Sequence, residues 1–66
     1  MTLDVGTSYA SAKAQAQAEA NRSSEPWVLQ FVDGTWYAGS LSAHPVVVPT
    51  FQYSEVIHPE PRIEKV

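Results

Sequence analysis

The segment from Trp27 to Leu41 constrains the fold more than any other part of this 66-residue sequence. Two runs rich in aromatic and β-branched residues flank the dipeptide Asp33-Gly34. An Asp-Gly pair between such runs is a strong signal for a two-residue type I′ turn, because both turn positions need a positive φ. The sequence therefore predicts a β-hairpin over about 27–41.

This turn also predicts which side chains share a face of the hairpin. With Val32 opposite Thr35, side chains that alternate along each strand fall into two sets. One face carries Trp27, Leu29, Phe31, Trp36 and Ala38, and the other carries Val28, Gln30, Val32, Thr35 and Tyr37. We expect the first set to form the core face, with a stabilising cross-strand pair between Phe31 and Trp36.

Residues 8–22 predict an N-terminal helix, since they are mostly Ala, Gln, Lys, Glu and Arg. Thr7 or Ser8 is expected to cap its start, and Pro26 prevents its continuation. On a helix, Tyr9, Ala12, Ala16 and Ala20 form one narrow stripe. The segment has no Leu, Ile, Val or Phe. We expect it to lie flat on its own sheet; a helix–helix contact in an oligomer and partial disorder are the alternatives.

The rest of the chain completes a small sheet. We expect a third strand over about 45–53, at an edge or a bulge because of Pro49. Residues 54–57 either continue this strand or form a short fourth one. From His58 to Val66 we expect an extended tail, which is a second candidate binding element.

The predicted fold is a single α+β domain over residues 1–66. One N-terminal Ala-rich helix packs on a small antiparallel sheet of 3–4 strands, built around the 27–41 hairpin, and residues 2–5 are a candidate for one further short strand. Leu, Ile, Val and Phe make up only 15 of the 66 residues, and there is no cysteine. Neither disulfides nor thiolate zinc sites can reinforce so thin a core, which favours oligomerisation or docking on a larger partner.

The net charge of −3 is unevenly distributed. No Lys or Arg occurs between Ser23 and Pro61, where the acids are Glu25, Asp33, Glu55 and Glu60. Direct binding of nucleic acid is excluded on this ground, because it depends on Lys and Arg next to phosphates. The sequence has neither a basic, apolar leader nor the roughly 20 apolar residues of a membrane span, so we expect a cytoplasmic protein without membrane contact.

No catalytic, metal or cofactor site is expected. His44 and His58 lack the fixed spacing of a metal site, and no serine lies in a G-x-S-x-G turn. The three glycines form no phosphate-binding loop. We therefore predict that the protein is not an enzyme.

The aromatic and apolar residues of the sheet instead indicate protein binding. We expect the second hairpin face to contact a partner with a basic rim through Val28, Gln30, Val32 and Tyr37. The neighbouring acids Asp33 and Glu55 are expected to take part. In the alternative arrangement, the third strand and the tail fold back and hide this face.

The expected function is a small interaction module that binds, and inhibits or adapts, a larger protein. Composition of this kind is frequent among phage and mobile-element accessory proteins. A structural subunit of a virion or another homomeric assembly is the second hypothesis. An acidic mimic of nucleic acid is the third, although four acids across the middle of the chain are few for such a mimic.

Overall fold

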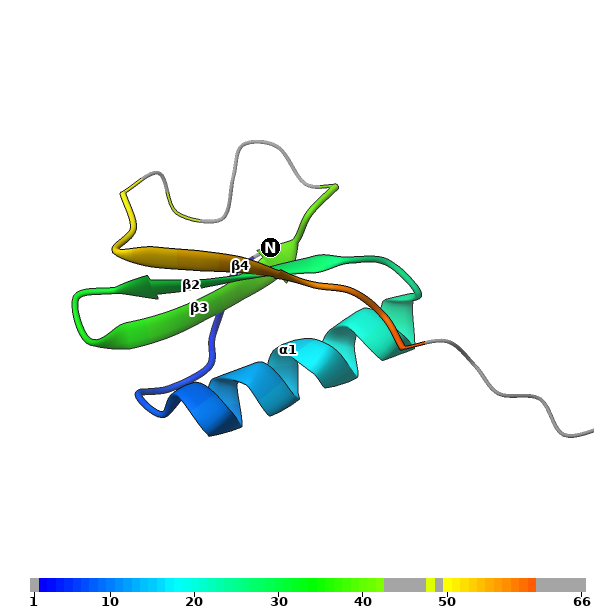
Figure 1. Cartoon of the computed structure of the whole chain (residues 1–66), viewed down its shortest axis with the longest axis horizontal. Helices are drawn as coiled ribbons and strands as arrows, with labels where there is room; N and C mark the ends of the chain where they lie inside the picture. Colours follow the sequence, from blue (N-terminus) through cyan, green and yellow to red (C-terminus); the bar gives the residue numbers. More distant parts are fainter. Residues whose placement is uncertain (1, 43–47, 49, 61–66) are drawn as a thin grey trace, which may run out of the picture.

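A computed structural model describes residues 2–42, 48 and 50–60. These residues form, in chain order, β1 (Thr2–Asp4), α1 (Tyr9–Ser23), β2 (Trp27–Val32), β3 (Thr35–Ser40) and β4 (Tyr53–Ile57). The four strands make one antiparallel sheet in the order β1-β3-β2-β4. Helix α1 covers one face of this sheet (Figure 1). The predicted α+β fold, an Ala-rich helix on a small antiparallel sheet, is confirmed.

The hairpin of β2 and β3 has the predicted register. Val32 pairs with Thr35, and Phe31 pairs with Trp36. Asp33 has a φ of 49° and Gly34 a φ of 83°, as a type I′ turn requires at its two central positions. Local sequence is sufficient to set this register, because the turn type fixes the pairing of the flanking residues.

Helix α1 contributes the predicted alanine stripe to the core. Ala12, Ala16 and Ala20 are completely buried. The core cluster that they join consists of Val5, Trp27, Leu29, Trp36, Ala38 and Ile57, with Leu3 and Phe31 packed at its margin. Small side chains let the helix lie close to the strands, so the core remains thin but continuous.

The two ends of α1 are formed mainly by the backbone. Ser8 occupies the N-cap position, but its side chain makes no capping hydrogen bond. At the other end, Ser24 is left-handed with a φ of 58°, and its N–H donates to the carbonyl oxygen of Ala20. This left-handed residue ends the helix two positions before Pro26.

The edge strand β4 begins later than the expected strand over 45–53. Residues 45–47 and 49 of that stretch lie outside the described part of the chain, and 48 and 50–52 are not in a strand. Gln52 holds the chain at the hairpin end: its N–H donates to the carbonyl oxygen of Phe31 over 2.8 Å. Regular pairing with β2 starts at the next residue, Tyr53.

Beyond β4, the described part of the expected tail lies against α1. Gln17 donates to the carbonyl oxygen of His58 over 2.8 Å. Asn21 exchanges two hydrogen bonds with Glu60, one to its carboxylate and one from its backbone N–H. The remainder of the tail, residues 61–66, lies outside the described residues. In the part of the chain that is described, α1 has neither the length nor the apolar character to cross a bilayer.

Candidate partner-binding site

Four of the predicted binding residues lie on the sheet face that points away from α1. Val28 and Gln30 are buried there, whereas Val32 and Tyr37 are half-buried. Their side chains alternate with those of Leu29 and Ala38, which belong to the core. Two of these four residues are therefore less accessible than an exposed binding face requires.

Gln30 shows why this face is covered. Only 1% of its surface is exposed, and its side-chain oxygen accepts a hydrogen bond from the N–H of Val48 over 2.8 Å. Val48 therefore lies beside the Gln30 side chain on this face of the sheet. A partner cannot bond to the Gln30 oxygen without displacing Val48.

The other two predicted residues lie elsewhere. Asp33 is exposed at the hairpin turn, where its N–H donates to the side chain of Gln52 over 2.8 Å. Glu55 pairs with Leu29 in the sheet, so its side chain lies on the face toward α1. The sheet therefore separates Glu55 from the Val28–Tyr37 group, and the six predicted residues do not form one surface.

A different surface gathers aromatic rings at the hairpin end of the helix–sheet layer. We call it the aromatic patch, and it consists of Tyr9, Phe31, Trp36 and Tyr53. Trp36 is central: its ring centroid lies 5.0 Å from that of Tyr9, 4.8 Å from that of Phe31 and 5.9 Å from that of Tyr53. The Trp36–Tyr53 pair is edge-to-face, an arrangement that the ring quadrupoles favour.

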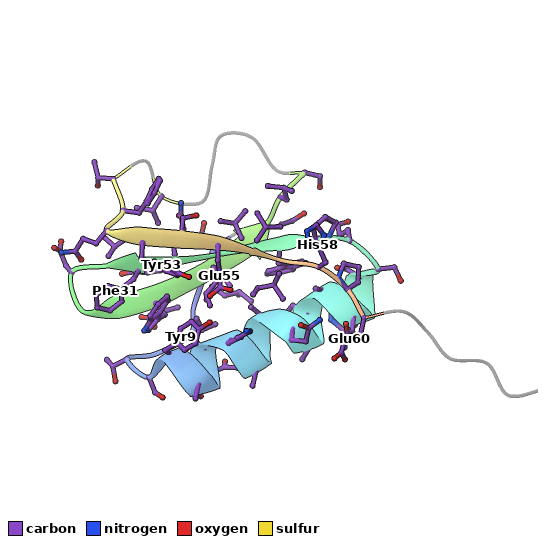
Figure 2. All side chains as sticks on the ribbon, in the orientation of Figure 1. Tyr9, Phe31, Tyr53, Glu55, His58 and Glu60 are labelled. Atoms are coloured by element: carbon purple, nitrogen blue, oxygen red, sulfur yellow. The ribbon has the colours of Figure 1, made fainter. Side chains whose placement is uncertain are left out.

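The patch combines a buried centre with accessible flanks. Trp36 is only 8% exposed, whereas Tyr9 is 41% and Tyr53 48% exposed. Figure 2 shows Tyr9 reaching from the first turns of α1 toward the sheet, with Phe31 and Tyr53 on the strands above it. Both tyrosine rings are thus supported by the core and are open to a partner.

Glu55 lies beside the patch and connects its two layers. The hydroxyl of Tyr9 donates to the carboxylate of Glu55 over 2.7 Å. This hydrogen bond is the main reason that the pKa of Tyr9 is raised above its ordinary value. The ammonium nitrogen of Lys13 lies 5.9 Å from the centre of the Tyr9 ring, on the helix side of the patch.

Glu55 has a hydrogen-bond donor but no cationic partner within the described residues. The ion pair found there joins Arg22 to Glu19 on the surface of α1. No cluster of three or more metal-ligating side chains occurs in this part of the chain. The site therefore offers aromatic rings and one carboxylate.

The sequence contained part of this site. The Phe31–Trp36 pair and the position of Tyr9 at the start of the alanine stripe followed from the hairpin register and helix periodicity. Tyr53 was missed as a member, because the expected strand over 45–53 ended there instead of beginning there. The position of Tyr53 next to β2 depends on the pairing of two strands far apart in the sequence, and no local motif specifies that pairing.

No protein-family model matches the chain, and neither the curated proteins nor the solved structures contain a significantly similar one.

Proposed function

We propose that this protein is a small interaction module that binds a larger protein through the aromatic patch and Glu55, and thereby inhibits or adapts it. The observation that carries the proposal is the pair of exposed tyrosines, Tyr9 and Tyr53, held around the buried Trp36. Rigid aromatic side chains at the rim of a packed core are frequent anchors in protein interfaces, since they bury a large area at little entropic cost.

The charge beside the patch favours a partner with a basic rim. Glu55 meets no cation in the described part of the chain, and the sequence has no Lys or Arg from Ser23 to Pro61. An Arg or Lys of the partner would gain from the Glu55 carboxylate and from the exposed face of Tyr53. Complementary charge of this kind speeds association and suppresses wrong partners.

The test is quantitative affinity capture from cells that carry the gene, comparing two single variants. Tyr53→Ser removes an exposed ring of the patch. Phe51→Ser is the matched control, because Phe51 is equally exposed at 49% but stacks on none of the patch rings among the described residues. We expect Tyr53→Ser to lose the partner about tenfold or more, and Phe51→Ser to retain it.

Two results would contradict the proposal. Equal capture by both variants and the unmodified protein would remove the aromatic patch from the interface. Recovery of further copies of this chain alone, with a multimer in light scattering, would support the homomeric assembly instead.

A further inference from the structure

We infer that the partner adds an extended strand to the outer edge of β4, with a Lys or Arg side chain beside Glu55. This inference rests on the proposed function and specifies the form in which the partner is recognised. Strand addition is a common mode of peptide recognition, in which main-chain hydrogen bonds supply affinity and alternate side chains supply specificity.

The register shows which backbone groups of β4 point outward. Just beyond the paired ends of β2 and β3, the N–H of Leu41 donates to the carbonyl oxygen of Pro26. Hydrogen-bonded pairs alternate along an antiparallel ladder, so the even-numbered residues of β2 are the ones that bond to β3. The odd-numbered residues of β2 are left for β4, where they pair with residues 53, 55 and 57. The N–H and C=O groups of Ser54 and Val56 therefore point away from the sheet.

The edge at β4 is protected only against strands of like charge, because its one charged side chain is Glu55. Natural edge strands are commonly very short, or carry charged side chains, especially Lys, or Pro. The opposite edge strand, β1, has three residues, and the carboxylate of Asp4 folds back onto the N–H of Gly6. Strand β4 has five residues, no Lys and no Pro, and Val56 is 43% exposed. It is the longer and less protected edge of the sheet.

Side chains on the helix-facing side of β4 define what the added strand must carry. Tyr53, Glu55 and Ile57 point to that side. A residue directly opposite Glu55 on an added strand would have its Cβ about 4.5–5.5 Å away. Opposite charges at such a position stabilise a sheet, whereas like charges destabilise it. A basic residue in this position also reaches the ring of Tyr53.

The same charge argues against a second copy of this chain as the occupant. Two β4 strands that pair antiparallel over their full five residues have Glu55 at the centre. Glu55 then lies opposite Glu55 of the copy, which is the unfavourable like-charge pair. A strand from a different protein avoids this repulsion, and one with Lys or Arg replaces it by attraction.

The first experiment selects ligands for the whole chain from a displayed library of randomised eight-residue peptides. We expect the enriched peptides to combine β-branched residues with Lys or Arg. A synthetic copy of the best peptide should slow hydrogen exchange at the amides of Ser54 and Val56. Enrichment of peptides without basic residues, protection at other amides, or no enrichment would overturn the inference.

Two further changes test the charge and the strand pairing separately. Glu55→Gln should weaken binding of the peptide about tenfold or more, because it removes the charge of the side chain but keeps its shape. N-methylation of the peptide amides that face β4 should abolish binding, whereas N-methylation of the alternate amides should not. If both methylated peptides bind equally, the peptide does not pair as a strand.

A protein variant separates this inference from the proposed function. Val56→Pro removes an N–H that points outward, so the ladder to β2 is kept, and Val56→Thr restores that donor. Loss of the captured partner with Tyr53→Ser but not with Val56→Pro would leave the proposed function standing and reject strand addition. If the partner is captured by both variants, the proposed function and strand addition are both rejected. A dimer that Val56→Pro dissociates would identify a second copy as the occupant and overturn the inference.

Discussion

The hydroxyl of Tyr9 donates a hydrogen bond to the carboxylate of Glu55 over 2.7 Å, and so joins the start of helix α1 to the edge strand β4. The two residues are 46 positions apart in the sequence. Through this bond, the helix that covers the sheet also supports the side chain that we propose as the charged element of the binding site. A carboxylate held in one orientation loses less entropy when a partner binds.

Removing the charge of Glu55 should lower the pKa of Tyr9. The carboxylate raises this pKa in two ways, as an acceptor for the protonated hydroxyl and as a charge that disfavours the tyrosinate. In Glu55→Gln the second effect disappears, so Tyr9 should ionise at a lower pH in an alkaline spectrophotometric titration. The part of the titration curve that belongs to Tyr9 should disappear in Tyr9→Phe. The same part should remain in Tyr37→Phe. An unchanged Tyr9 titration in Glu55→Gln would contradict the assignment.

The hairpin turn should depend on glycine at position 34. Gly34 has a φ of 83°, and an added Cβ would meet no atom within 4 Å. Any loss of stability in Gly34→Ala therefore comes from the backbone conformation alone. We expect the free energy of unfolding, measured with urea, to fall by about 1–2 kcal/mol in Gly34→Ala, which is the usual cost of an L-residue in the left-handed conformation. A chemically synthesised chain with D-alanine at this position is the control and should retain full stability.

The hairpin and the helix were predictable because short-range rules determine them. Asp33-Gly34 sets the register of β2 and β3, and the 3.6-residue period places Ala12 and Ala16 on the buried stripe. Strand β4 was less predictable, since its pairing depends on the hydrogen bonds that Gln52 makes to the end of the hairpin. The position of the aromatic patch followed from that pairing.

The predicted binding face failed to appear as one surface for a related reason. Alternation correctly placed Val28 and Gln30 on the face away from the helix, but it could not show that Val48 bonds to Gln30 on this face. Glu55 was grouped with them from charge alone, before its strand register was known. Local patterns therefore gave the faces of the hairpin, and long-range contacts decided which of them are accessible.

The alanine stripe of α1 should be intolerant of larger side chains. Ala16 has no exposed surface and faces the sheet, so Ala16→Leu must displace core atoms. Overpacking of this kind costs about 1–3 kcal/mol of unfolding free energy. Ala14→Leu is the control: position 14 is exposed and Leu is nearly as good a helix former as Ala. Equal stability of the two variants would show that α1 does not pack closely on the strands.

Glu25 should make the protein less stable in acid. The hydroxyls of Ser40 and Ser42 donate to its carboxylate and hold its pKa below the ordinary value. Because the folded-state pKa is the lower one, this stabilisation is present above the unfolded-state pKa and is lost as pH falls through the folded-state pKa. Urea unfolding measured across acidic pH should show that Glu25→Gln loses less unfolding free energy than the unmodified protein as the pH falls. In Ser42→Ala the loss should begin at a higher pH. If the pH dependence is unchanged in both variants, Glu25 does not contribute to acid sensitivity.

Gln30 and Gln52 offer a matched test of what burial adds to a hydrogen bond. Each side-chain oxygen accepts a backbone N–H over 2.8 Å, from Val48 and Asp33 respectively. Gln30 is buried, whereas Gln52 is exposed, so water can replace only the second acceptor readily. Gln30→Met should therefore lower the free energy of unfolding by about 1 kcal/mol, because the half-buried N–H of Val48 loses its acceptor.

The same change at position 52 should cost clearly less, because the freed N–H of Asp33 is exposed and can bond to water. Hydrogen exchange at the amide of Val48 distinguishes the two effects: it should accelerate in Gln30→Met and stay unchanged in Gln52→Met. If both variants unfold at the same urea concentration, Val48 does not bond to Gln30 in solution. The face with Val28 and Tyr37 would then be open to a partner, as the hairpin pattern alone had suggested.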